Sequence, residues 1–117
     1  MDKDTIDYIF NYYLGLMTEK ESIAYRHLMS TEKLIAYNHD INDDDNSRVK
    51  IYKEKNWLTS DKEALELLKE GSTSFKENVS KRLFTEHRKD IFLNYCPVCG
   101  QLARTPKAKQ CRQGHTW

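Results

Sequence analysis

The stretch NYCPVCGQLARTPKAKQCRQGHTW, residues 94 to 117, holds all three cysteines of the chain and one of its four histidines. Two cysteines stand in the short sequence CPVCG, which begins at Cys96, and Cys111 and His115 follow after a spacer of eleven residues. Three cysteines cannot all pair as disulfides, and such short spacings in a chain expected in a reducing compartment are typical of metal ligands. The stretch therefore predicts a metal site.

The cluster has the form C-x2-C-x11-C-x3-H, which supplies the four sulfur and nitrogen ligands that Zn²⁺ takes in tetrahedral sites. Cys96 and Cys99 stand three positions apart on a tight turn, where Gly100 permits the positive φ that turns backbone N–H groups toward sulfur. The spacer has the length of two short strands around a turn at residues 105–107. We therefore expect Cys96, Cys99, Cys111 and His115 to hold one structural Zn²⁺ on a β-hairpin.

The residues that follow the last ligand narrow the type of zinc module. Only Thr116 and Trp117 follow His115 in the sequence. A ββα finger or a treble clef needs a helix that carries or follows its second ligand pair, and a retroviral knuckle has a different spacing. A zinc ribbon, with one hairpin and two ligand turns, is the module that remains.

Residues 94–117 resemble a zinc ribbon by their CPVCGQLARTPKAKQC string. With the segment WLTSDKEALELLKEGSTSFKENVSKRLFTEH, they are similar to small bacterial proteins that end in such a ribbon. The resemblance implies that Cys96, Cys99 and Cys111 are ligands. The second turn of a ribbon is usually C-x-x-C-G, whereas Gly114 stands here where its second cysteine is expected. His115 is the chemically sensible substitute.

The first 93 residues carry helical signals. Thr18 and Glu21 form a capping box, in which each side chain satisfies a backbone donor of the other residue. We expect helices that begin at Asp4, Thr18, Ser47, Ser60 and near Ser72, with ends near Asn38, Asn56 and Gly71 for the second, third and fourth. The second is expected to bury Ala24, Leu28, Thr31, Leu34 and Ile35. The prediction is a mainly α protein, with a helical bundle at 1–93 and a zinc-ribbon β-hairpin at 94–117.

Charge and hydropathy exclude several classes of protein. Lysine and arginine number 19 against 18 aspartates and glutamates, so net charge indicates neither a polyanionic nor a membrane partner. The N-terminus lacks the pattern of a signal peptide, and no stretch approaches the ~18 apolar residues of a membrane span. We expect a soluble, cytoplasmic protein. The acidic run DINDDDNS at residues 40–47 lacks the glycine and glutamate of an EF-hand and is expected to be a surface loop.

The ligand set also bears on catalysis. A catalytic zinc keeps three protein ligands and an open position for water, whereas four ligands fill the tetrahedral shell here. The glutamate that zinc deaminases carry beside a ligand does not follow any ligand in this sequence. We therefore predict a protein that is not an enzyme, with a zinc enzyme as the less favoured alternative.

Two kinds of binding protein remain. The first is a protein-interaction or regulatory module with a protein partner that the sequence does not identify. The alternative is nucleic-acid binding through the basic ribbon, because the segment after Asp90 has no acidic residue and carries Arg104, Lys107, Lys109 and Arg112. We expect Arg104 to pack beside Leu102 on the helical part and to reach Glu86 or Asp90. Lys107, Lys109 and Arg112 would then remain for a partner, and three cations are few for nucleic acid.

Overall fold

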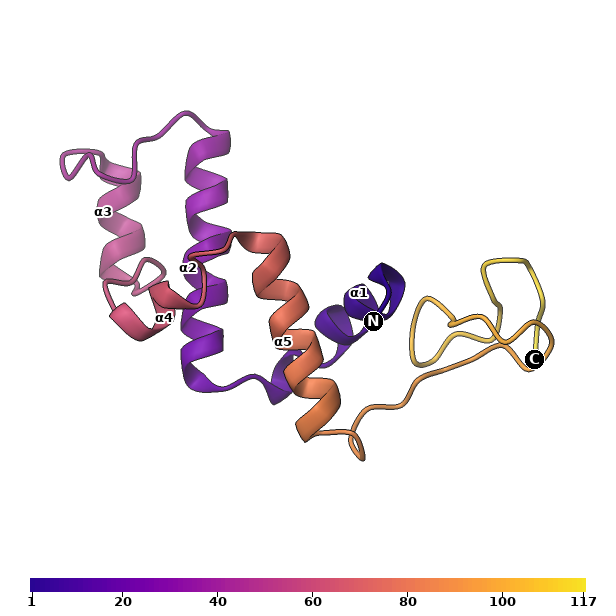
Figure 1. The fold of residues 1–117 in the computed structure, drawn as a ribbon. Helices are drawn as coiled ribbons and strands as arrows, with labels where there is room; N and C mark the ends of the chain where they lie inside the picture. Colours follow the sequence, from indigo (N-terminus) through magenta and orange to yellow (C-terminus); the bar gives the residue numbers. More distant parts are fainter. The chain divides into compact units, whose positions relative to one another are not determined.

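The computed structural model describes residues 1–117 and is mainly helical, which confirms the expected fold class. Its α-helices are α1 (Lys3–Tyr12), α2 (Glu19–Ala36), α3 (Ser47–Glu54), α4 (Lys62–Glu66) and α5 (Ser72–Glu86), with a 3-10 turn η1 (Leu14–Leu16) after α1 (Figure 1). None of these helices has both the length and the apolar character needed to cross a membrane.

The chain forms two compact units. One unit is Thr18–Phe75, and the other combines Met1–Met17 with Lys76–Trp117, so that the boundary falls inside α5. The first helix of the chain thus belongs to the same unit as the cysteine-rich segment. The predicted division into a helical domain at 1–93 and a zinc ribbon at 94–117 refers to segments that fold independently. The two compact units do not test independent folding, so this division stays a prediction.

The unit Thr18–Phe75 begins with the predicted capping box. The hydroxyl of Thr18 accepts a hydrogen bond from the backbone N–H of Glu21 at 3.2 Å, and the Glu21 carboxylate accepts one from the N–H of Thr18 at 2.9 Å. Together they satisfy two of the N–H groups that a helix start leaves unpaired. The capping box thus fixes where α2 begins.

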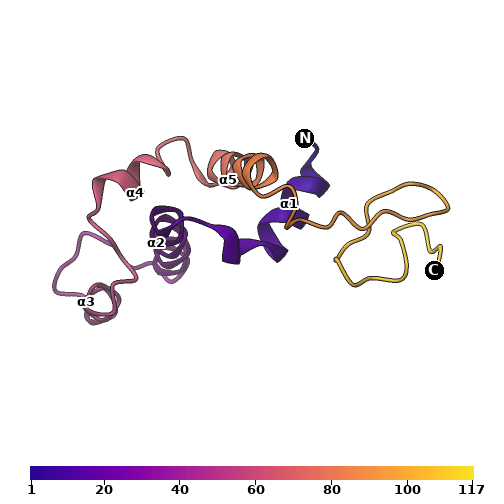
Figure 2. The same ribbon diagram turned by 90° about the horizontal axis from the view of Figure 1, so that it is seen from below.

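The helices α2 and α3 run in opposite directions (Figure 1) and lie side by side in both views (Figures 1 and 2). Leu34 of α2 packs in a buried cluster with Val49 and Tyr52 of α3. The expectation that Ile35 is buried is wrong, because this side chain is 64% exposed. Successive helix positions point about 100° apart, so Ile35 turns away from the face that Leu34 buries.

The fourth helix begins one residue later than expected. Asp61, rather than Ser60, caps α4, because its carboxylate accepts hydrogen bonds from the N–H groups of Glu63 and Ala64. The same carboxylate pairs with Lys20, the second residue of α2. The predicted end of α3 is confirmed, since Asn56 has a φ of +60°.

In the other unit, α1 packs against α5. The helix α1 buries Tyr8, Ile9 and Phe10, and its N-cap is Asp2 rather than the expected Asp4. The hydroxyl of Ser80 on α5 donates a hydrogen bond to the carbonyl of Ile6 at 3.2 Å. This bond leaves the buried hydroxyl of Ser80 with a partner inside the helix pair.

Two tyrosines tie α1 to the backbone just before the first cysteine. The hydroxyl of Tyr8 donates to the carbonyl of Phe92 at 2.5 Å and accepts from the N–H of Asn94 at 3.3 Å. The hydroxyl of Tyr13 accepts from the N–H of Phe92 at 3.0 Å and donates to its carbonyl at 3.2 Å. Residues 92–94 are therefore held by hydrogen bonds from the start of the chain.

The prediction of a C-terminal β-hairpin is wrong. The segment contains two isolated antiparallel bridges, Tyr95 with Leu102 and Gln110 with Thr116, and no sheet. Each bridge closes a loop of its own, so that the backbone groups that would pair across a hairpin are used within the loop. The turn predicted at residues 105–107 is present, with the N–H of Ala108 donating to the carbonyl of Thr105 at 3.3 Å.

Replacing Tyr8 with Phe should lower the free energy of unfolding by about 1–2 kcal/mol, because the buried N–H of Asn94 loses its hydrogen-bond acceptor. Urea denaturation measures the change. Tyr12 is the matched control, since its ring lies beside that of Tyr8 but its side chain is half exposed. Tyr12→Phe should leave stability unchanged, and equal losses in the two variants would contradict a specific role for the Tyr8 hydroxyl.

The hydroxyl of Tyr8 should ionise at a higher pH than an ordinary phenol does. Burial is the main cause that raises the pKa of Tyr8 to about 12. Because the folded state holds this proton more tightly than the unfolded chain does, the stabilisation is complete below about pH 10 and is lost as the pH rises toward 12. In an ultraviolet titration of the seven tyrosines, the absorbance change should include a component near pH 12, and Tyr8→Phe should remove that component.

Candidate metal centre

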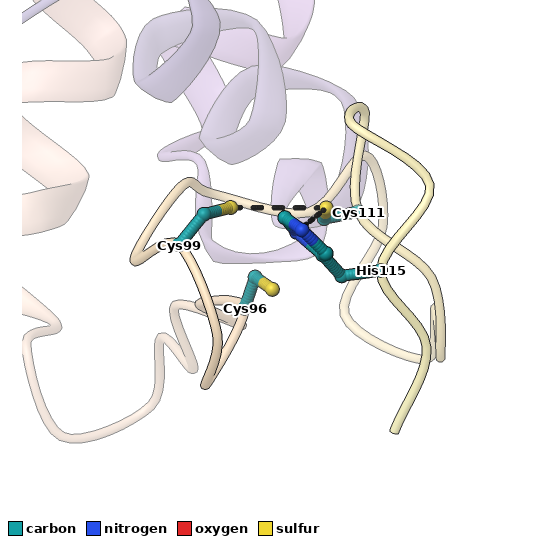
Figure 3. A group of neighbouring side chains, drawn as sticks. All are labelled: Cys96, Cys99, Cys111 and His115. Carbon is teal, nitrogen blue, oxygen red and sulfur yellow. Dashed lines mark hydrogen bonds between the residues drawn. The ribbon is translucent and has the colours of Figure 1, made fainter.

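Four side chains converge on one point at the C-terminal end of the chain. Cys96 and Cys99 come from one loop, and Cys111 and His115 come from a second loop that faces it (Figure 3). Their ligand atoms all lie within 4.8 Å of one another. Cys96 and Cys111 are buried, His115 is half-buried and Cys99 is exposed. All four residues predicted as ligands are thus together and could bind a metal ion.

The separations within the cluster suit a tetrahedral ion. Two sulfurs bound at about 2.3 Å to one tetrahedral Zn²⁺ lie about 3.8 Å apart, and a sulfur and an imidazole nitrogen lie about 3.6 Å apart. The sulfurs of Cys99 and Cys111 are 3.8 Å apart, and Nδ1 of His115 is 3.3 Å from the sulfur of Cys111 (Figure 3). The side chains present therefore fit a four-coordinate metal.

The first ligand loop turns sharply after Cys96. The N–H of Gly100 donates to the carbonyl of Cys96, and the N–H of Cys96 donates to the carbonyl of Gln101, both at 2.8 Å. Gly100 has the positive φ, +74°, that the sequence predicted. Within this loop the N–H of Val98 points at the sulfur of Cys96 at 3.4 Å. A thiolate at Cys96 thus has a backbone donor before any ion arrives.

The second loop repeats this design with one residue fewer. The N–H of Gly114 donates to the carbonyl of Cys111 at 3.0 Å, and the N–H of Cys111 donates to the carbonyl of His115 at 2.8 Å. Gly114, with φ +92°, occupies the place after Cys111 that Cys99 occupies after Cys96. The fourth ligand therefore comes one residue later, from an imidazole long enough to reach the cluster.

The electrostatics of the three thiols favour a cation among them. Partial burial raises the pKa of Cys96 and of Cys111, but backbone N–H groups aimed at each sulfur outweigh it, so that both values lie below that of an ordinary thiol. The N–H of Gln101 likewise lowers the pKa of Cys99, but burial and the two neighbouring sulfurs together raise it above the ordinary value. Three thiolates at this separation repel one another, and a divalent cation removes that penalty.

Asn94 joins the two loops to the rest of the unit. This side chain is buried, and its amide group donates to the carbonyls of Thr105 and Ala108 at 3.0 and 2.9 Å. Its backbone carbonyl accepts from the N–H of Ala103 at 2.7 Å. The spacer between the ligand pairs is thus fastened to a residue two positions before Cys96.

Two of the basic residues predicted as a possible contact surface, Lys107 and Arg112, line different hollows. The four basic residues of the segment are all exposed: Arg104, Lys107, Lys109 and Arg112. Lys107 lines a hollow with Tyr12 and Tyr13, whereas Arg112 lines a different hollow that contains Asp2 and Asp4. The backbone carbonyl of Lys109 accepts from the N–H of Trp117 at 2.9 Å.

The expected placement of Arg104 on the helical part is not observed. The side chain is exposed, whereas its neighbour Ala103 is fully buried. Glu86 pairs with Arg82, and the carboxylate of Asp90 lies 3.7 Å from the His87 ring. Of residues 101–105, only Ala103 is buried, and Leu102 is half-buried, so the predicted pairing of Leu102 with Arg104 on one packed face is not found.

Comparisons with protein-family models, with curated proteins and with solved structures found no match to this chain. The site is therefore defined by its own geometry.

Sequence reasoning missed the residues that position the site. Asn94, Tyr8 and Tyr13 make hydrogen bonds to backbone groups 11 to 86 positions away. A tyrosine on an apolar helix face and an asparagine before a cysteine carry no pattern that indicates such partners. Only the position of Asn94 two residues before the first ligand could have drawn attention to it.

Replacing Asn94 with Asp keeps the shape of the side chain but turns two donors into acceptors that face the carbonyls of Thr105 and Ala108. The free energy of unfolding should fall by about 2–3 kcal/mol, because the buried carboxylate of the variant faces two carbonyl oxygens and can donate to neither. Urea denaturation followed by far-UV circular dichroism measures the loss. Asn78→Asp on the exposed face of α5 is the control and should change stability by less than about 0.5 kcal/mol.

Proposed function

We propose that the protein binds one Zn²⁺ through Cys96, Cys99, Cys111 and His115, and that the ion is structural. The observation that carries the proposal is the convergence of three sulfurs and one imidazole nitrogen within 4.8 Å, from two loops with matching backbone hydrogen bonds. Thiolate and imidazole ligands favour Zn²⁺ among the divalent ions that prefer tetrahedral sites. Zinc supplies the positive charge that lets all three thiols ionise.

The structural role follows from the number of ligands. Four protein ligands fill a tetrahedral shell, whereas a catalytic zinc needs a free position for water or substrate. Regular secondary structure does not hold the two loops together, since each contains one isolated bridge. An ion shared by both loops supplies the link that a sheet would provide in a larger domain.

The function that we propose for the whole chain is a non-enzymatic protein-interaction or regulatory module that carries a structural zinc site. Its support is a small fold whose exposed surface includes large apolar side chains on both units, among them Ile35, Tyr37, Phe92, Tyr95 and Val98. Nucleic-acid binding has less support. Arg112 shares its hollow with two aspartates, which repel phosphate, and Lys107 lines another hollow.

The metal is tested by elemental analysis of the purified protein, which should give one zinc per chain. Cobalt substitution should give the absorption bands of tetrahedral thiolate coordination. Cys99→Ser should weaken metal binding more than His115→Ala, because water can take the fourth position but replaces a thiolate poorly. A competition titration with a chromogenic chelator measures the order of the two variants.

His39 offers a matched control, because its ring lies in the other unit and bonds to Asn46. His39→Ala should keep wild-type zinc affinity. Protein without zinc, or a cobalt spectrum without tetrahedral bands, would refute the proposed centre.

A further inference from the structure

A hollow of about 500 Å³ lies between the end of α1 and the spacer of the metal centre, all within one unit. Its lining residues are Tyr12, Tyr13, Thr105, Pro106 and Lys107. This volume is in the range of ligand-binding pockets, about 300–1,000 Å³. Three of the five lining residues are tyrosine or proline, and Lys107 is the single charged residue among them.

The walls of the hollow are held in place before any partner binds. The hydroxyl of Tyr13 is fixed by both backbone groups of Phe92, and the Tyr8 ring lies 5.9 Å from that of Tyr12 and 6.3 Å from that of Tyr13. On the other side, the carbonyl of Thr105 accepts from the Asn94 side chain. A surface whose side chains are already ordered loses less conformational entropy when it binds.

We infer that this hollow is the docking site for a partner protein, and that it takes a peptide segment in which an acidic residue stands beside an aromatic or aliphatic one. The inference rests on the proposed function as an interaction module and names its surface. The tyrosine and proline rings cover the apolar side chain, and the Lys107 ammonium pairs with the carboxylate at the edge of the hollow.

The charge around the hollow favours a peptide over a nucleic acid. A single-stranded nucleic acid needs cations that follow its successive phosphates, with aromatic rings for its bases. Arg112 belongs to a separate hollow beside Asp2 and Asp4, so the hollow at Lys107 offers one cation only. One carboxylate next to one apolar group matches that arrangement.

The test uses the full zinc-loaded chain and a phage library of random dodecapeptides. Selected peptides should combine Asp or Glu with Phe, Trp or Leu. The affinity of fluorescein-labelled copies, measured by anisotropy, should fall about tenfold or more in Lys107→Glu and in Tyr12→Ala, since each loses a contact to the peptide. Lys109→Glu is the matched control, because Lys109 is an exposed cation of the same spacer that does not line the hollow. It should bind as the wild type does.

Failure to select peptides of this composition, or equal affinity in Lys107→Glu and wild type, would overturn the inference. Tight binding of an oligothymidylate that Lys107→Glu abolishes would also overturn it, by assigning the hollow to nucleic acid. Zinc content and the unfolding curve are measured on each variant sample. Zinc-loaded, folded protein that binds no peptide refutes the docking site alone, whereas folded protein without zinc refutes the metal centre.

Discussion

The amide group of Asn94 uses both of its N–H groups on the carbonyls of Thr105 and Ala108, while its backbone N–H donates to Tyr8 and its carbonyl accepts from Ala103. Four hydrogen bonds thus meet at one buried residue. The first ligand loop starts two positions later, and the spacer carries the chain on to the second. Because the cysteine-rich segment forms no sheet, these bonds take over the positioning that strand pairing would provide.

The features that the sequence could predict are those that depend on near neighbours. The capping box at Thr18, the left-handed Asn56 and the turn at residues 105–107 each involve groups at most three positions apart, and each is found. The grouping of the four candidate ligands was also predictable, because the CPVCG loop and the Cys111 loop each bring two of these side chains together by local geometry. Only the contact between the two loops depends on tertiary structure.

The errors arose where distant groups compete for the same atoms. A hairpin was expected between the ligand pairs, but the N–H groups of Cys96 and Ala103 bond within the first loop, and the Asn94 side chain donates to the carbonyls of Thr105 and Ala108. In the same segment Ala103 is buried and Arg104 is exposed, because the N–H of Ala103 bonds to the carbonyl of the buried Asn94. Asp61 replaced Ser60 as a cap because its carboxylate also meets Lys20, 41 positions earlier in the chain. Local propensity cannot rank such alternatives.

The unit that contains the metal centre is assembled from two pieces of chain, Met1–Met17 and Lys76–Trp117, with Thr18–Phe75 between them. The order of synthesis on the ribosome therefore differs from the order in which structure can be completed. Residues 18–75 are continuous in the sequence, whereas α1 bonds through Tyr8 to Phe92 and Asn94, which are synthesised 84 and 86 positions later. Until α5 and residues 92–94 have been made, Ile9 and Phe10 of α1 lack the later segments of the unit in which they are buried.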